Sequence, residues 1–338
     1  MFKEYIYLEN LTNFQKDLVH DFNNKFKEYE KIVSCEICES SKISILFNND
    51  RYGINNKTCF CDECGFIFSN PRMTNRFIEF FYNSDFYRFL YSGTSKEFNE
   101  ETLFSTTLLE LKNYKPEVPK KPNFNQYYPN LYFDFINNEI KDFESVLDIG
   151  CGKGKKLIDF NNIKKKAEGI EPSKIYNKVH TEIGLNSNIG FIKDVKKKYD
   201  LVLLAHVFEH LTNLKESVDI LSNITKKYLF IEVPGHVKKL QSIQNAHNYY
   251  FSLNTLNYFI LNNKFKLIKA DYVRDNEFLM ALYEKTEERS EYKFNKKEER
   301  EYITYISKIY FLKYILIKFL RLTGLEKISR FIYNKLKK

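Results

Sequence analysis

The chain has 338 residues, of which 43% are hydrophobic and 29% are charged, so it can bury a core in about two domains. Its formal net charge of +9 raises the question of nucleic-acid binding, yet nine Lys or Arg and a single acid, Glu326, fall between Ile303 and Lys338. The first 302 residues hold 44 basic and 43 acidic side chains, which argues against the basic surface that tracking a phosphate backbone requires.

The first elements along the chain are a polar helix and a cysteine-rich segment. We expect the helix over residues 1–31 and a zinc-ribbon module over 32–72. Two C-x-x-C pairs separated by 22 residues suit one structural, tetrahedral Zn²⁺, which would replace a core that so short a segment cannot build. The predicted ligands are Cys35, Cys38, Cys61 and Cys64. Disulfides are the alternative, but Lys3 and Glu4 interrupt any secretory signal, so we expect reduced thiols in a cytoplasmic protein.

A glycine-rich turn follows a helical, proline-containing connector over residues 73–126. The apolar strand Val146–Ile149 contains Asp148 and leads directly into this turn. The turn contains Gly150, Cys151, Gly152 and Gly154. Backbone N–H groups of such a turn, and the start of the next helix, can approach a ligand that side chains would block. Lys155 stands where the dinucleotide fingerprint requires its third glycine, so a nicotinamide cofactor is the weaker hypothesis.

An acidic residue, Glu171, ends the next predicted strand and could accept hydrogen bonds from both hydroxyls of a ribose. Together with Asp148 and the glycines it resembles the class I S-adenosylmethionine-dependent methyltransferases. The resemblance spans residues 127–285 and continues through the strand Tyr199–Ala205 and the following "EHL" segment at Glu209. It implies an α/β, Rossmann-like domain of seven strands. The implied S-adenosylmethionine contacts are Asp148, Gly150, Cys151, Gly152, Gly154, Glu171, Pro172, Asp194, Ala205 and His206.

The zinc module limits the resemblance to a smaller group of methyltransferases. Residues 64–72 and 80–83 look like bacterial methyltransferases of sugar and surface-polysaccharide pathways, which carry a small N-terminal zinc-binding domain. Their relatives include C-methyltransferases of nucleotide-linked keto-sugars, in which one segment reads Y-H-E-H-x-x-Y-F-S. In this chain, residues 244–252 correspond to that segment, and Gln244 stands at the position of its first Tyr. We also expect no counterpart of the large C-terminal domain of the keto-sugar enzymes after the last strand. O-methylation of a sugar or sugar-derived group is therefore favoured, and C-methylation of a keto-sugar is the alternative.

The predicted catalytic residues lie in that same segment. His247 is the expected general base, because an imidazole with a pKa of about 6.5 can accept the proton of a hydroxyl near neutral pH. Its alternative role is to cap the loop before the next helix. Tyr250 either orients the acceptor or packs in the core. The pattern His206-x-x-Glu209-His210 has the letters of a metal-binding motif without its helix, so we expect His206 to line the cofactor pocket and His210 to fix the loop.

Residues 286–338 predict a basic helical tail, in which residues 287–301 form a solvated linker helix. The tail is too charged to span a bilayer, but its aromatic and basic residues suit peripheral contact with the inner membrane. Burial against the catalytic domain or a second subunit competes with that hypothesis. The expected partner is a small-molecule or glycan acceptor and no nucleic acid, with the oligomeric state open. An RNA methyltransferase and a non-enzymatic zinc scaffold remain as rival functions.

Overall fold

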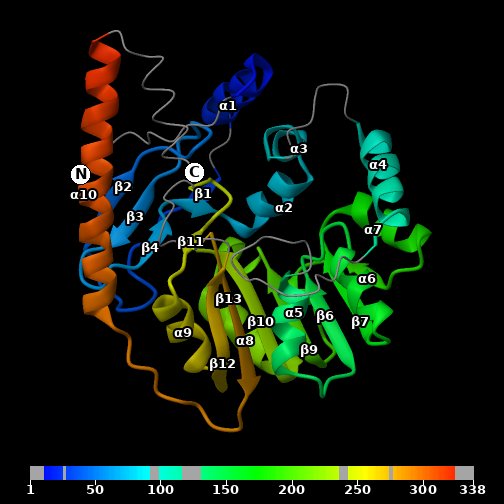
Figure 1. Ribbon diagram of the computed structural model, residues 1–338. Coiled ribbons are helices and arrows are strands. Elements are labelled where there is room, and N and C mark those ends of the chain that lie inside the picture. Colours follow the sequence, from blue (N-terminus) through cyan, green and yellow to red (C-terminus); the bar gives the residue numbers. More distant parts are fainter. Residues whose placement is uncertain are drawn as a thin grey trace.

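The computed structural model describes residues 11–25, 28–91, 99–115, 131–235, 243–273 and 277–323. Its centre is a seven-stranded sheet in the order β12-β13-β10-β9-β6-β7-β8 (Figure 1). The strands are β6 (Ser145–Ile149), β7 (Lys166–Glu171), β8 (Ser187–Ile189), β9 (Tyr199–Ala205), β10 (Thr225–Pro234), β12 (Phe265–Val273) and β13 (Phe278–Lys285). The strands from β8 to β10 run parallel, and β13 is antiparallel to both of its neighbours. The predicted Rossmann-like sheet of seven strands is confirmed.

The alternation of side chains along a strand explains how both faces of this sheet are covered. In β9, Leu201 and Leu203 join one buried cluster, while Val202 and Leu204 join another on the opposite face. Helices α5 (Leu131–Glu139) and α6 (Lys155–Asn162) pack into the first cluster, and α8 (Leu214–Ile224) and α9 (Leu253–Leu261) into the second. A further helix, α7 (Lys174–Glu182), follows β7. A continuous apolar strand buried on both faces is what a parallel sheet between two helix layers requires.

The cysteine-rich segment forms a second, four-stranded sheet in the order β11-β4-β3-β2. Its strands are β2 (Ile43–Phe47), β3 (Thr58–Cys61), β4 (Ile67–Ser69) and β11 (Tyr249–Tyr250). The strand β11 is distant in sequence from the other three and lies between β10 and α9. The two sheets are therefore not independent units. They also share one core, in which the buried Phe66 ring lies 5.7 Å from that of Phe259 and 6.2 Å from that of Phe251.

The N-terminal helix is shorter than predicted. Helix α1 covers Asn13–Lys25, and the strand β1 (Tyr29–Glu30), expected from the sequence to lie inside the helix, pairs with β5 (Arg72–Met73). Tyr29 explains the early end, because its hydroxyl donates to Asn245 at 3.0 Å and its ring lies 5.8 Å from that of Phe77. Packing against the catalytic part of the chain therefore outweighs local helix propensity.

The described part of the connector, which leaves out residues 92–98 and 116–126, forms three helices. They are α2 (Asn75–Asn83), α3 (Asp85–Tyr91) and α4 (Glu100–Lys112). Helix α2 begins where the Thr74 hydroxyl accepts from the backbone N–H of Phe77, and α4 begins where the Asn99 side chain accepts from that of Thr102. Figure 1 shows these helices above the edge of the large sheet at which the parallel strands end.

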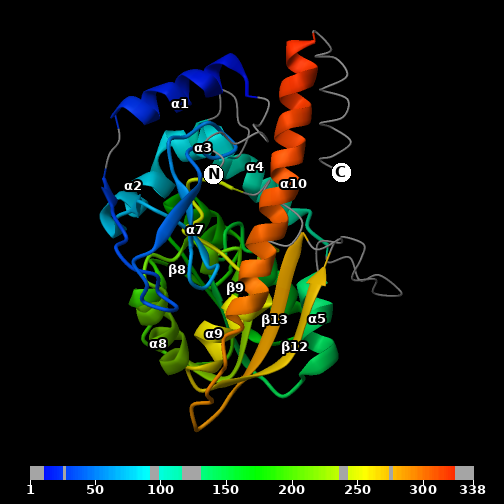
Figure 2. The same cartoon turned by 90° about the vertical axis from the view of Figure 1, so that its left-hand side faces the viewer.

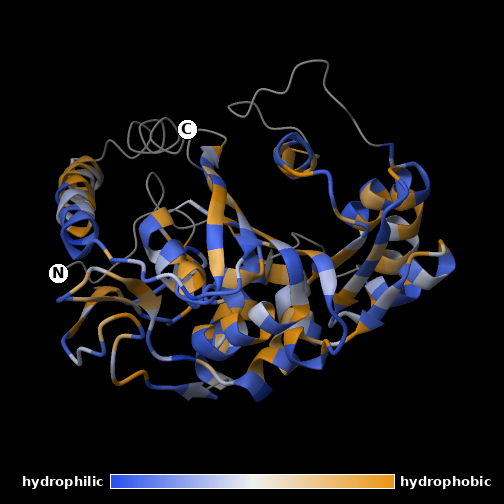
Figure 3. Ribbon diagram, turned by 90° about the horizontal axis from the view of Figure 1, so that it is seen from below, coloured by the Kyte–Doolittle hydropathy of each residue, from blue (hydrophilic) through white to orange (hydrophobic). Residues whose placement is uncertain are grey.

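The tail begins later than predicted, since α10 covers Lys296–Leu322 and no helix is found over 287–295. Its first half packs on the small sheet, where Ile303, Ile306 and Tyr310 are buried with Phe47 (Figure 2). Its second half exposes Phe311, Leu312, Ile315, Leu316, Phe319 and Leu322. Figure 3 shows hydrophobic and hydrophilic residues mixed along α10. Burial against the rest of the chain thus holds for the first half, and membrane contact stays a prediction.

None of the described helices combines the length and the apolar character that crossing a membrane demands. The predicted basic residues after Thr323 lie outside the described part of the chain.

Candidate functional site

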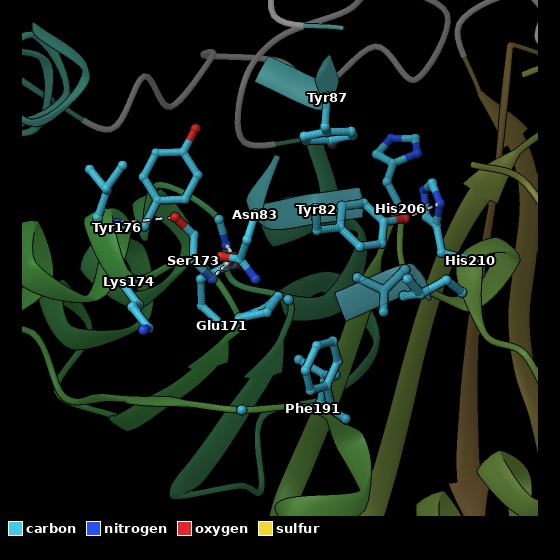
Figure 4. Close-up of a pocket in the computed structure, with 18 of the residues that line it drawn as sticks. Tyr82, Asn83, Tyr87, Glu171, Ser173, Lys174, Tyr176, Phe191, His206 and His210 are labelled. Carbon is cyan, nitrogen blue, oxygen red and sulfur yellow. Dashed lines mark hydrogen bonds between the residues drawn. The ribbon is translucent and has the colours of Figure 1, made fainter. Parts of the chain in front are cut away.

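A cavity of about 630 Å³ lies between the carboxyl ends of the parallel strands and the connector helices (Figure 4). Its size falls within the range of about 300–1,000 Å³ that is usual for small-molecule sites. Five predicted residues line it, namely Gly150, Gly152, Glu171, Pro172 and His206. The site is at the place where open α/β sheets bind ligands, outside the carboxyl ends of the strands.

The glycine turn forms the floor of this cavity and depends on backbone conformations that favour glycine. Gly150, Gly152 and Gly154 have φ values of +65°, +53° and +92°. A Cβ on Gly150 would lie 2.5 Å from Cγ2 of Val207, whereas one on Gly152 would meet nothing within 4 Å. The turn therefore passes close to the 206–211 loop at Gly150 and leaves open space at Gly152, where a ligand can approach the backbone.

The Gly150→Ala variant should lower the free energy of unfolding by about 3 kcal/mol, because it adds a clash to the cost of a left-handed residue. Gly184 gives a matched control, since its φ is +73° and nothing lies within 4 Å of its Cβ position. Gly184→Ala should therefore cost only about 1 kcal/mol. Urea denaturation of both variants measures the difference. Equal losses would show that the contact with Val207 does not limit this turn.

Two buried carboxylates flank the turn. Glu171 accepts the backbone N–H of Gly152 on Oε2 and that of Ser173 on Oε1, both at 2.9 Å. Asp148 is 1% exposed, and neither of its carboxylate oxygens has a hydrogen-bond partner among the described residues. Burial raises the pKa of Asp148 to about 6, and the ammonium of Lys156, 4.0 Å away, opposes that rise only in part. A buried carboxylate that lacks hydrogen-bond partners fits the cationic methionine end of S-adenosylmethionine.

The remaining predicted cofactor residues do not line the cavity. Cys151 is buried in the turn, Gly154 starts α6, and Ala205 ends β9, so none of them lines the cavity. Asp194 is exposed, and its Oδ2 accepts the N–H of Phe191 at 2.8 Å. Asp194 therefore holds the turn after β8, while Phe191, beside it, supplies an apolar wall that suits a flat ring. The predicted contact between Asp194 and S-adenosylmethionine stays a prediction.

His206 occupies the other end of the cavity with a strained backbone, since its φ is +57°. Its Nδ1 lies 3.5 Å from Oε1 of Glu209, and its Nε2 lies 3.5 Å from Oε1 of Glu232. Burial lowers the pKa of His206, but the two glutamates outweigh this effect and raise the pKa to about 10. The prediction that His206 lines the pocket agrees with its position.

The connector contributes a wall that was not predicted from the sequence. From α2 and α3 come Ile78, Tyr82, Asn83 and Tyr87, and from α4 come Glu100 and Leu103. The Tyr82 hydroxyl lies 2.8 Å from Nδ1 of His210, which also lines the cavity (Figure 4). The aromatic run at residues 80–83 was the available signal. Helical spacing shows which of its side chains face the core, but it does not show what α2 packs against.

The two predicted catalytic residues do not line the cavity. His247 is 5% exposed and lies behind His210, with the two ring centres 4.8 Å apart. Tyr250 is buried in the core beneath α10, together with Ile303. Packing therefore accounts for Tyr250, and the histidines that reach the cavity are His206 and His210.

The four predicted zinc ligands converge, and we call them the cysteine cluster (Cys35, Cys38, Cys61 and Cys64). Their sulfur atoms all lie within 4.8 Å of one another, with 3.5 Å between Cys35 and Cys64 and 3.4 Å between Cys38 and Cys61. These separations are too long for disulfide bonds of about 2.05 Å. They fit thiolates placed about 2.3 Å from a single Zn²⁺.

Comparisons with known proteins agree with this geometry. Residues 104–269, a little under half of the chain, match a family described as a methyltransferase domain. This match begins within α4, earlier than the predicted domain boundary at residue 127. An uncharacterised protein of Methanocaldococcus jannaschii is 27% identical over 121 residues, which cover 34% of this chain and 47% of that protein. The alignment therefore spans about half of that relative.

Two solved structures are also similar. A putative S-adenosylmethionine-dependent methyltransferase from Listeria monocytogenes is 16% identical, with 45% of this chain and 96% of that chain covered and a TM-score of 0.39. Magnesium protoporphyrin IX methyltransferase from Synechocystis, with bound SAH, is 12% identical, with 63% and 100% covered and a TM-score of 0.43. Because these scores are low, the assignment depends on the matched domain, the strand order and the glycine turn. The chain carries a class I, S-adenosylmethionine-dependent methyltransferase domain.

Proposed function

We propose that the whole protein transfers the methyl group of S-adenosylmethionine to a hydroxyl of a sugar or sugar-derived acceptor in surface-polysaccharide biosynthesis. One observation carries the proposal. A single cavity joins the glycine turn and Glu171 at one end to His206, His210 and Tyr82 at the other. The first group suits the cofactor, and the second suits an acceptor that must be oriented and must lose a proton.

The chemistry of methyl transfer explains why such residues are needed. Displacement at the methyl carbon releases a neutral thioether, so the protein need not stabilise a departing anion. It must align the acceptor oxygen with the methyl group and remove the hydroxyl proton. The imidazole of His210 and the hydroxyl of Tyr82, 2.8 Å apart, lie at the cavity surface, where they would orient the acceptor hydroxyl.

The cavity wall also favours a sugar over a nucleic acid. Tyr82, Tyr87 and Tyr176 offer aromatic faces for the C–H groups of a sugar ring. Gln244, at the place of the first Tyr in the keto-sugar enzymes, contacts Nε2 of His247 and accepts from Arg51 at 2.9 Å. Gln244 therefore holds the loop rather than an acceptor, which supports O-methylation over C-methylation.

The test is transfer of a labelled methyl group from S-adenosylmethionine to nucleotide sugars, oligosaccharides and RNA in parallel. We expect an ether-linked label on a sugar. Tyr82→Phe should lower kcat about tenfold, the value of one lost hydrogen bond, without changing the affinity for S-adenosylmethionine. The exposed Tyr305→Phe is the control. Label on RNA, or on a sugar carbon, would replace the proposal with one of its rivals.

A further inference from the structure

The structure brings together three metal-binding side chains that are far apart in the sequence, and we call them the Glu-His cluster (Glu209, His210 and His247). Their ligand atoms all lie within 4.8 Å of one another. Glu209 and His210 belong to the short helix η2 (Phe208–His210) after β9. His247 is delivered by the segment before β11, whose Asn248 donates its backbone N–H to the Glu209 carbonyl at 2.8 Å.

Hydrogen bonds to β4 and to the end of η2 hold this segment in place. The Ser69 hydroxyl, on β4, donates to the carbonyl oxygen of His247 at 2.7 Å. The Asn248 side chain donates to the carbonyl oxygens of His210 and Leu211, each at 3.0 Å. These bonds fix the backbone that carries His247 against the backbone that carries His210, as a binding site requires.

Glu209 is the feature that points to a ligand. It is fully buried, and neither of its carboxylate oxygens has a hydrogen-bond partner among the described residues. Its Oε1 is surrounded by imidazole nitrogens, 3.5 Å from His206 Nδ1, 3.8 Å from His210 Nε2 and 3.9 Å from His247 Nε2. A carboxylate buried without hydrogen bonds is costly; the neighbouring imidazole of His206 offsets part of that cost, and a cation bound at the other two histidines would offset more of it.

The histidines present the atoms that a metal needs. Nδ1 of His210 lies 2.7 Å from the carbonyl oxygen of Ala246, which can only accept, so Nδ1 carries the proton and Nε2 keeps its lone pair. The side-chain nitrogen of Gln244 contacts Nε2 of His247, so a metal bound at that atom would displace Gln244 from it. Ligands of a tetrahedral ion lie about 3.3 Å apart, so small side-chain rotations would close the cluster around one.

We propose that Glu209, His210 and His247 bind a divalent transition-metal ion at the acceptor end of the cavity. Two imidazoles and one carboxylate favour Zn²⁺, Fe²⁺ or Co²⁺ over Mg²⁺ and Ca²⁺. Of the three ligands only His210 lines the cavity, so an oxygen ligand from the cavity would have to reach the fourth position of the ion past this side chain. The binding site stands on its own geometry, and only the identity of that oxygen as an acceptor hydroxyl depends on the proposed function.

The test counts metal equivalents in the full chain. After chelation and titration with Zn²⁺, we expect two equivalents in the wild type, one in the cysteine cluster and one here, and a single equivalent in Glu209→Gln. Glu232→Gln is the matched control, since Glu232 contacts His206 but lies outside the Glu-His cluster, and it should keep both. One equivalent in the wild type would overturn the proposal, as would two in Glu209→Gln.

A second measurement guards against misfolding of the variant. With the cysteine cluster filled by Cd²⁺, the wild type is titrated with Co²⁺, and its visible absorption should show oxygen and nitrogen ligands without thiolate charge-transfer bands. Thiolate bands, or no uptake of Co²⁺, would overturn the proposal. Uptake of Co²⁺ by a protein that methylates no sugar would leave the metal site intact and refute the proposed function instead.

Discussion

Replacing Glu171 with Gln should weaken S-adenosylmethionine binding about 100-fold. The two carboxylate oxygens of Glu171 accept the N–H groups of Gly152 and Ser173, and its edge toward the cavity is free to accept ribose hydroxyls. An amide removes the charge and places a donor against a backbone donor. The loss of charge-assisted hydrogen bonds, at about 1.5–3 kcal/mol each, corresponds to this change in affinity. Isothermal titration calorimetry on the purified protein measures it directly.

Glu182→Gln serves as the control, because Glu182 is an exposed acid at the end of α7, the helix that follows Glu171. It should bind the cofactor like the wild type. Asp148→Asn should also weaken binding, since it removes the charge that an ammonium group would neutralise. If the Glu171→Gln variant bound S-adenosylmethionine with the affinity of the wild type, the cofactor would occupy a different part of the cavity.

The large sheet could be predicted from the sequence because its signals are local. Strand β9 matches the predicted Tyr199–Ala205 to the residue, since an unbroken apolar run ends there at His206. The glycine turn and Glu171 were found in the same way, by spacing within one strand–turn–helix unit. These elements lie close together in the chain, so pattern and chemistry point to the same structure.

The acceptor end of the site could not be predicted, because it is assembled from distant segments. Tyr82 reaches the cavity from a connector helix, and His247 reaches Glu209 through the pairing of β11 with β4. No local pattern in residues 244–252 shows which sheet this segment joins. Histidine was therefore a plausible residue type to predict, but the cavity-facing position belongs to His210 and not to His247.

The shared sheet also makes the cysteine cluster important far beyond its own module. Arg72 is 1% exposed and links Glu36, inside the first C-x-x-C pair, to the carbonyl oxygen of Thr212 and to the hydroxyl of Tyr249. Tyr249 also donates to Glu36 at 3.0 Å. The knuckle that would bind zinc is thus connected to β11 and to the loop after η2, whose Leu211 lines the cavity.

For this reason, Cys61→Ser should lower the free energy of unfolding by at least about 4 kcal/mol and the melting temperature by about 10 °C. It should also remove one equivalent of zinc and abolish methyl transfer, because β4 can no longer hold β11 and His247 in register. Zinc analysis, calorimetry and the methyl-transfer assay measure these effects.

Cys59→Ser is the matched control for this prediction, since Cys59 is buried on the same strand but lies outside the cysteine cluster. It should keep its zinc and most of its activity, with only the modest loss that a buried hydroxyl causes. If Cys61→Ser lost its zinc yet methylated the acceptor at the wild-type rate, the cysteine module would be a separate unit. In that case the contacts of Arg72 and β11 would not transmit its folding to the active site.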